Sequence, residues 1–229
     1  MEKKKKIFLL RKYGRLLSWC FRLLNRNKCR KAKGNNFISL RGIYSAHSSF
    51  TISGEGNSIR IIPGITRFKN CTFTIKGNNN RILIEKDCNL NNCHLYIEDN
   101  GGFIHIGEHT TITGNTDIAV IEGCKVEIGK DCLLSSDIVL RTGDSHSVID
   151  AKTKERVNMS MDITIGEHVW IGHSVKVLKG VKVGNHSIIA TGAILTKRDY
   201  HDNVIIGGIG GKVLREGIDW CSQRLPFVN

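Results

Sequence analysis

The 229-residue sequence lacks several features that mark common classes of protein. It has no uninterrupted apolar run of 18 residues, which excludes an ordinary transmembrane helix. It has no Cys-x-x-Cys pair, and we expect its eight cysteines to be reduced side chains of a cytosolic protein. Apolar residues make up 40% of the chain, which excludes a wholly disordered protein and suffices for one domain with a core.

Excess positive charge is lacking everywhere except at the N-terminus. Residues 1–33 contain 13 Lys and Arg against one acid, whereas residues 34–229 contain 21 bases and 20 acids. The nearly neutral body gives no reason to expect a nucleic-acid partner. In residues 1–33 the bases interrupt apolar and aromatic residues, a pattern that predicts an amphipathic helix able to lie on an anionic membrane surface. The alternative is a helix that caps the core or packs on a partner subunit.

Apolar residues recur every six positions through the body of the chain. Similar strand-like segments end at positions 61, 84, 106, 128, 165 and 183. The longest unbroken series is Ile165, Ile171, Val177, Val183, Ile189 and Leu195. A period of six fits neither a helix nor simple strand alternation, but it fits a short strand and a turn with one inward side chain per unit. Three units form a triangular coil, and stacked coils bury a continuous apolar column.

This repeat predicts an all-β fold, a parallel β-helix built from hexapeptide units. We expect a basic amphipathic helix over residues 1–33, the β-helix over residues 34–205 and a short C-terminal extension over residues 206–229. One coil carries a large inserted loop at residues 141–164. The series is less regular upstream, where Ile84, Leu90 and Tyr96 still fit, and where Ile38, Tyr44 and Phe50 would form a first coil.

The chain resembles the hexapeptide-repeat acyltransferases in residues 141–150, in residues 163–172 and from there through Trp220. It also contains the repeated apolar-Gly units of that family, at Ile106-Gly107, Ile128-Gly129, Ile165-Gly166, Ile171-Gly172 and Val183-Gly184. The resemblance is greatest to the O-acetyltransferases of capsular and other surface polysaccharides. It implies a left-handed β-helix, acetyl-CoA as co-substrate, a carbohydrate acceptor, no metal, and a homotrimer with sites between subunits. With the basic N-terminal segment, it suggests a cytoplasmic protein at the inner face of the membrane.

The same resemblance implies roles for individual residues. His146, in the inserted loop, corresponds to the catalytic base, which suits the chemistry because an alcohol needs a base to attack a thioester at neutral pH. Asp144 is a candidate to fix the tautomer of His146, and Trp170 is a candidate wall of the acceptor and thioester site. The residues that correspond to CoA contacts are His173, Thr191, Thr196, Lys197, Lys212 and Arg215. The turn before the last two bases departs from the family pattern, because it reads Gly208-Ile209-Gly210-Gly211.

Two other functions compete with this interpretation. One is N-acyl transfer to an amino-sugar nucleotide, which would leave the basic N-terminus unexplained because such acceptors are soluble. The other is a zinc protein like the γ-class carbonic anhydrases, which share the fold, with His146, His168 and His173 as three histidine ligands around an open fourth position.

Overall fold

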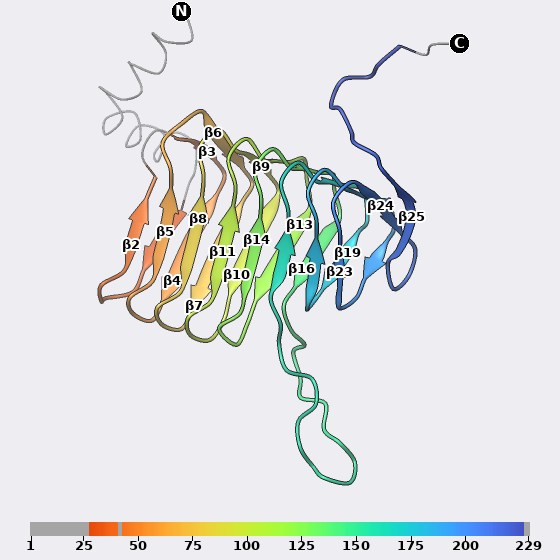
Figure 1. Ribbon diagram of the computed structural model, residues 1–229. Coiled ribbons are helices and arrows are strands. Elements are labelled where there is room, and N and C mark those ends of the chain that lie inside the picture. Colours follow the sequence, from red (N-terminus) through yellow and green to blue (C-terminus); the bar gives the residue numbers. More distant parts are fainter. Residues whose placement is uncertain (1–27, 41–42, 227–229) are drawn as a thin grey trace, which may run out of the picture.

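The computed structural model describes residues 28–40 and 43–226, and these residues form a left-handed parallel β-helix (Figure 1). Each coil contributes one strand to each of three sheets, so the cross-section is triangular. The predicted fold is therefore confirmed for this part of the chain. The predicted N-terminal helix lies almost entirely in residues 1–27, outside the described residues. Within the described residues no helix is long and apolar enough to cross a membrane.

The three sheets are here named A, B and C, and their strands follow in spatial order. Sheet A contains β1 (Lys28–Lys31), β4 (Ser49–Ser53), β7 (Thr72–Lys76), β10 (Cys93–Ile97), β13 (Thr116–Val120), β16 (Ile138–Arg141), β19 (Lys176–Leu178) and β22 (Ile194–Leu195). Sheet B contains β2 (Phe37–Ser39), β5 (Ser58–Ile61), β8 (Arg81–Ile84), β11 (Phe103–Ile106), β14 (Lys125–Ile128), β17 (Ile163–Ile165), β20 (Val181–Val183) and β23 (Arg198–Tyr200). Sheet C contains β3 (Ile43–Ala46), β6 (Thr66–Lys69), β9 (Asn89–Asn91), β12 (Thr111–Ile112), β15 (Leu133–Leu134), β18 (Trp170–Ile171), β21 (Ile188–Ile189), β24 (Val204–Gly207) and β25 (Lys212–Glu216). In each coil the chain passes from sheet A to sheet B at corner AB, from sheet B to sheet C at corner BC, and from sheet C to sheet A of the next coil at corner CA.

The core is a column of apolar side chains in register from coil to coil. In sheet B the column contains the residues that the repeat predicts, namely Ile61, Ile84, Ile106, Ile128, Ile165 and Val183, each paired with the next along parallel strands. All six are buried. Because the ladder hydrogen bonds between coils keep this register, the period of six in the sequence becomes a continuous dry interior.

The sequence interpretation was wrong about the inward side chain in two upstream strands. In β10 the core residue is Leu95, and Tyr96 points outward. In β3 Tyr44 is 46% exposed, and Ser45 pairs with the buried Phe68 of the next coil. Successive inward residues on either side of corner CA are only five positions apart in these coils, as from Leu90 to Leu95, so a count of six selects the neighbouring, outward side chain.

The coil stack is also longer than the predicted β-helix domain at both ends. Strand β1 already pairs with β4, so the coil includes Lys28–Lys31, which the sequence assigned to the N-terminal helix. At the other end β24 pairs with β21, and the antiparallel strand β25 adds an edge to sheet C. Much of the expected C-terminal extension is therefore part of the sheet.

Close stacking of the coils explains the glycines that follow the strands of sheet B. A Cβ built on Gly129 would lie 2.5 Å from the main-chain oxygen of Gly166 in the next coil. At corner BC, by contrast, the chain uses left-handed residues with side chains, including His109 and His168 with φ of 60° and 53°. Residues at equivalent corners therefore stack in a column on the outer surface.

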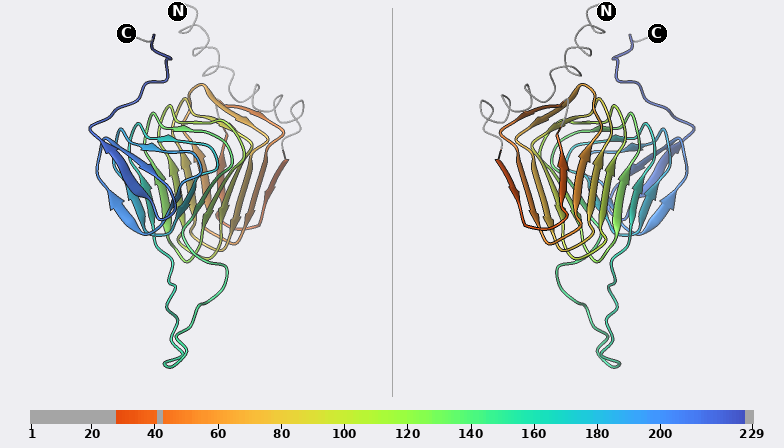
Figure 2. Two further views of the ribbon diagram at one scale, coloured as in Figure 1. Left: turned by 90° about the vertical axis from the view of Figure 1, so that its right-hand side faces the viewer. Right: turned by 90° about the vertical axis from the view of Figure 1, so that its left-hand side faces the viewer.

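One long excursion leaves the coil in the part of the chain that the structure describes. Residues 142–162 connect β16 to β17 at corner AB and project far from the body, as both side views show (Figure 2). The two arms of the loop pair through an antiparallel bridge between Ile149 and Arg156. The C-terminal segment leaves the body on the opposite side from this loop (Figure 1).

Candidate active site

A cavity of about 710 Å³ lies where the inserted loop leaves sheet A. Strands β10, β13 and β16 form its floor, and the start of the loop forms one wall. Its lining side chains include His94, Tyr96, Asp117, Arg141, Asp144, His146 and Arg156. Except for a few apolar groups on the floor, the lining consists of side chains that can donate or accept hydrogen bonds, which suits a polar ligand such as a sugar.

His146 lies at the edge of this cavity with an exposed side chain. Its main-chain oxygen accepts a hydrogen bond of 2.8 Å from the Nδ2 of Asn158, which joins the two arms of the loop. Within the described residues no side chain or main-chain group hydrogen-bonds either ring nitrogen. The imidazole is therefore available to a ligand, and it is held in place through the backbone of the loop.

Asp144 has a different set of partners from the one expected. Its Oδ2 accepts hydrogen bonds from Lys179 Nζ at 2.6 Å and from Asn158 Nδ2 at 2.8 Å. The ammonium of Lys179, and secondly the amide of Asn158, hold the pKa of the Asp144 carboxyl below its ordinary value. No hydrogen bond joins Asp144 to the His146 ring in the described chain, so the expected tautomer-fixing contact is absent there. Asp144 instead fastens the loop to corner AB of the next coil.

Sequence reasoning missed both Lys179 and Asn158. Lys179 follows β19, 35 residues after Asp144, and its ammonium also donates to the main-chain oxygen of Asn158 at 3.1 Å. Nothing in the local sequence marks a lysine in a hexapeptide corner as a partner of a distant loop. Only the stacking of the coil after the insertion onto the coil before it brings these groups together.

Ion pairs across successive strands make up the rest of the cavity wall. The Asp117 carboxylate contacts His94 Nδ1 at 2.9 Å and Arg141 Nη2 at 2.7 Å. These two partners, His94 first, lower the pKa of Asp117 from its ordinary value. Arg156 reaches back from the loop to Glu122 at 2.6 Å and lowers the pKa of that carboxyl. The loop is therefore attached to the body at two places, through Lys179 and through Arg156.

The predicted CoA-binding residues do not converge within one chain. His173 and Thr191 lie at corner CA in successive coils, with His173 Nδ1 3.0 Å from the Oγ of Ser136. Thr196 and Lys197 lie at corner AB, in the same column of corners as Lys179 and the inserted loop. All four of these predicted contacts have exposed side chains, on two different edges of the prism.

The remaining two predicted contacts, Lys212 and Arg215, lie on the exposed edge strand β25. The Gly208–Gly211 segment that departs from the family pattern forms the turn between β24 and β25. Arg198 Nη1 and the Tyr200 hydroxyl both donate to the main-chain oxygen of Gly211, at 3.2 and 3.1 Å. The turn is therefore well held, and it places both bases on the outer rim of sheet C.

The three histidines of the alternative zinc hypothesis lie at three different corners of the prism, and Trp170 lies on sheet C. Trp170 lies on β18 in sheet C, 40% exposed, with its ring 6.1 Å from that of Trp220. His146, His168 and His173 belong to corners AB, BC and CA respectively, so one chain does not assemble the zinc site of the alternative hypothesis. His168 instead lies beside His186 and Asp219.

Comparison with known proteins agrees with this architecture. A model of the bacterial transferase hexapeptide (six repeats) matches residues 162–197. A polysialic acid O-acetyltransferase of Neisseria meningitidis is 34% identical over 153 residues, which cover 57% of this chain and 70% of that protein. The chain belongs to the hexapeptide-repeat acyltransferase family. It is therefore grouped with enzymes, since the relatives found are named as acetyltransferases.

Two further relatives of this acyltransferase show how far the similarity extends. A polysialic acid O-acetyltransferase of Escherichia coli O1:K1 is 32% identical over 121 residues, which cover 53% of this chain but only 39% of that protein. The crystal structure of the polySia-specific acetyltransferase NeuO superposes with a TM-score of 0.81 at 27% identity, covering 88% of this chain and 92% of that one. The structural match thus extends well beyond the matched repeats.

Proposed function

We propose that the protein is an O-acetyltransferase that moves an acetyl group from acetyl-CoA to a sugar hydroxyl of a surface polysaccharide, with His146 as general base. The observation that carries the proposal is the imidazole of His146, which lies at the edge of a polar cavity and has no hydrogen-bond partner among residues 28–40 and 43–226. The family supplies the reaction class, and the relatives named above act on polysialic acid. A sialic acid polymer is therefore the first acceptor to test.

In the proposed reaction His146 takes the proton of the acceptor hydroxyl as its oxygen attacks the thioester carbonyl of acetyl-CoA. The tetrahedral intermediate then expels the CoA thiolate, and the imidazolium returns the proton to that sulfur. No acyl-enzyme is formed, so no cysteine is needed. The burial of the Cys88 and Cys132 thiols, which raises the pKa of each to about 12, is consistent with a direct transfer.

The predicted CoA-binding residues lie at different corners of the chain, and this division supports a homotrimer. His146 and Lys197 belong to corner AB, and His173 and Thr191 belong to corner CA. If corner AB of one subunit faces corner CA of the next, the base and four of the six predicted CoA contacts (His173, Thr191, Thr196 and Lys197) form one site between two chains. Such a contact joins two different surfaces, and it closes a ring of three when each subunit is rotated by about 120° from the next.

The test is CoA-thiol release by the full-length protein with acetyl-CoA and a sialic acid polymer. His146→Ala should lower kcat about 10²–10⁴-fold, the usual contribution of a general base, with little change in KM. His109→Ala is the matched control, because His109 is also an exposed histidine but lies at corner BC away from the cavity. A His146→Ala variant as active as the control would refute the proposed base. An active enzyme that acetylates only neutral polysaccharides would refute the acceptor.

A further inference from the structure

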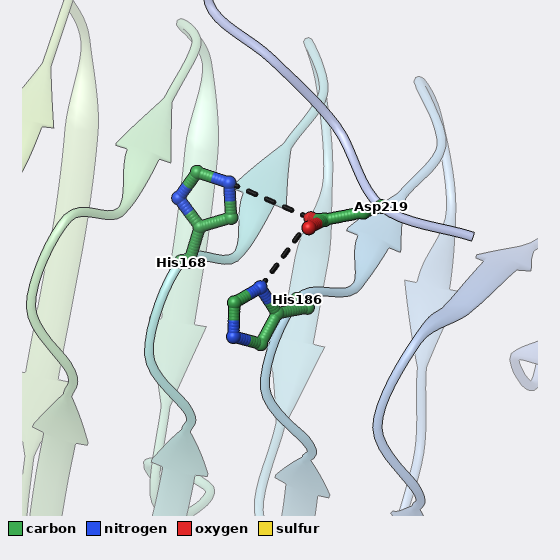
Figure 3. A group of neighbouring side chains, drawn as sticks. All are labelled: His168, His186 and Asp219. Carbon is green, nitrogen blue, oxygen red and sulfur yellow. Dashed lines mark hydrogen bonds and ion pairs between the residues drawn. The ribbon is translucent and has the colours of Figure 1, made fainter. Parts of the chain in front are cut away.

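Two histidines and a carboxylate meet at corner BC, outside the cavity described above. His168 and His186 occupy equivalent corners in successive coils, and Asp219 approaches from the C-terminal segment (Figure 3). The Oδ1 of Asp219 lies 3.6 Å from His168 Nε2 and 3.4 Å from His186 Nδ1. One ligand atom from each of the three residues lies within 4.8 Å of the other two.

We propose that His168, His186 and Asp219 bind one divalent transition-metal ion, of which Zn²⁺ is the representative. Bonds of about 2.0–2.2 Å from tetrahedral zinc to nitrogen and oxygen place neighbouring ligand atoms about 3.3–3.5 Å apart. The two measured separations, 3.6 and 3.4 Å, are close to this spacing. Two imidazoles and a carboxylate form a ligand set that first-row metals prefer and that Mg²⁺ and Ca²⁺ do not.

The surroundings of the three ligands fit a metal site. The ring of His168 stacks on that of Trp220 at 4.2 Å, with the planes 6° apart, and Trp220 Nε1 donates to the main-chain oxygen of His168 at 2.6 Å. The orientation of this imidazole is therefore fixed before a metal arrives. Its Nε2 donates to the main-chain oxygen of Trp220 at 3.0 Å. The metal would replace that proton, and the Trp220 oxygen lies close enough to approach the ion.

The same corner contains a comparison site of similar composition. His109 lies between Asp87 and Asp131 in earlier coils, with separations of 3.6 and 3.2 Å. There, however, the two carboxylates contact different ring nitrogens, Nε2 and Nδ1. These nitrogens point in opposite directions, so one ion cannot bind both carboxylates and the histidine. Composition and exposure are alike, and only the direction of the ligand atoms differs.

A metal at this site would fasten the C-terminal segment across two coils. At present that segment is held by Trp220 and by a pair of hydrogen bonds between Asn203 and Ile218, of 2.8 and 3.1 Å. The ion would add bonds from Asp219 to the corners before β18 and β21. Because Trp220 lies beside Trp170 on sheet C, the metal would also fix the position of this aromatic pair.

The experiment is calorimetric titration of the untagged, EDTA-stripped full-length protein with Zn²⁺, with Mg²⁺ as the negative control. We expect one Zn²⁺ per chain with micromolar affinity. His186→Ala and Asp219→Asn should each weaken binding at least about tenfold, since even partners that only support the ligands are worth about 10–100-fold. His109→Ala should bind as the wild type does. Cys221→Ser should also bind normally, which separates this site from the exposed thiol two residues after Asp219.

Hydrogen exchange provides a second readout that does not depend on activity. Zn²⁺ should slow amide exchange in residues 217–222 of the wild type and leave it unchanged in His186→Ala. His186 is exposed, so this variant should keep its fold, which circular dichroism can verify. The proposal is overturned if the wild type fails to bind Zn²⁺ at about 100 µM. It is equally overturned if His186→Ala binds as tightly as wild type, or if Cys221→Ser abolishes binding.

Discussion

Replacing Lys179 by methionine should slow acetyl transfer about five- to tenfold without unfolding the coil. Lys179 makes the 2.6 Å contact with Asp144 and the 3.1 Å contact with the main-chain oxygen of Asn158. Asn158 in turn donates to the main-chain oxygen of His146. The lysine therefore acts on the base only through the loop that carries it, as a positioning residue.

The expected size of the effect follows from the geometry. A hydrogen bond to a charged group is worth about 1.5–3 kcal/mol when sheltered, and an exposed ion pair about 0.2–1 kcal/mol. The Lys179 side chain is 24% exposed and that of Asp144 is 50% exposed, so solvent screens the pair substantially. We therefore expect Lys179→Met to lose about 1–1.5 kcal/mol of transition-state stabilisation through poorer positioning of the loop, which corresponds to about a five- to tenfold fall in kcat/KM.

The assay is steady-state kinetics of CoA-thiol release for Lys179→Met, Asp144→Asn and the double variant. Because both partners serve one contact, the double variant should be little slower than either single one. Lys182→Met is the matched control, because Lys182 forms a Lys–Asp pair of 3.4 Å with Asp199 outside the loop. If Lys179→Met and Lys182→Met have the same kcat/KM, or if the two single effects simply add, the positioning argument fails.

Two further predictions concern acid stability and membrane binding. The pKa of Asp117 is lowered in the folded protein by His94 and Arg141, so its ion pairs stabilise the fold above the ordinary carboxyl range, and this stabilisation is lost as the pH falls through the lowered pKa. In acid titration followed by circular dichroism, Asp117→Asn should therefore be less stable than wild type near neutrality, and the two stabilities should converge in strong acid. A constant difference in stability at every pH would contradict this assignment. Residues 1–27 contain nine Lys and Arg, and deleting them should lower the affinity for anionic vesicles, measured by co-sedimentation, at least about a hundredfold. Activity on soluble acceptors should stay unchanged. An unchanged affinity for the vesicles would refute the proposed placement at the inner face of the membrane.

Much of the fold could be predicted from the sequence because the information is local and repeated. Each six-residue unit specifies one inward apolar side chain, and a repeated local rule suffices to build a solenoid in which each coil contacts only its neighbours. The column from Ile61 to Val183 was predicted on this basis and confirmed by the strand register. The prediction failed at Tyr44 and Tyr96, because the step between inward residues across corner CA is five residues there rather than six.

The site could be predicted only in part, for a related reason. Sequence motifs located His146 and the loop that carries it, because the insertion interrupts a regular pattern. They could not show that Lys179 holds this loop, or that Asp219 approaches two histidines that lie 33 and 51 residues before it in the chain.

By itself, the sequence determined the coil, its apolar interior and the place where the chain leaves it, since each depends on side chains near one another in the chain. Only the tertiary structure decided which outward side chains meet. Because the coils stack, residues about one coil apart in the sequence become direct neighbours at a corner. Which residues meet depends on the lengths of the corners and of the inserted loop. It also divided the predicted CoA contacts among corner AB, corner CA and the edge strand β25, because residues a few positions apart in a coil lie on different sides of a triangular prism.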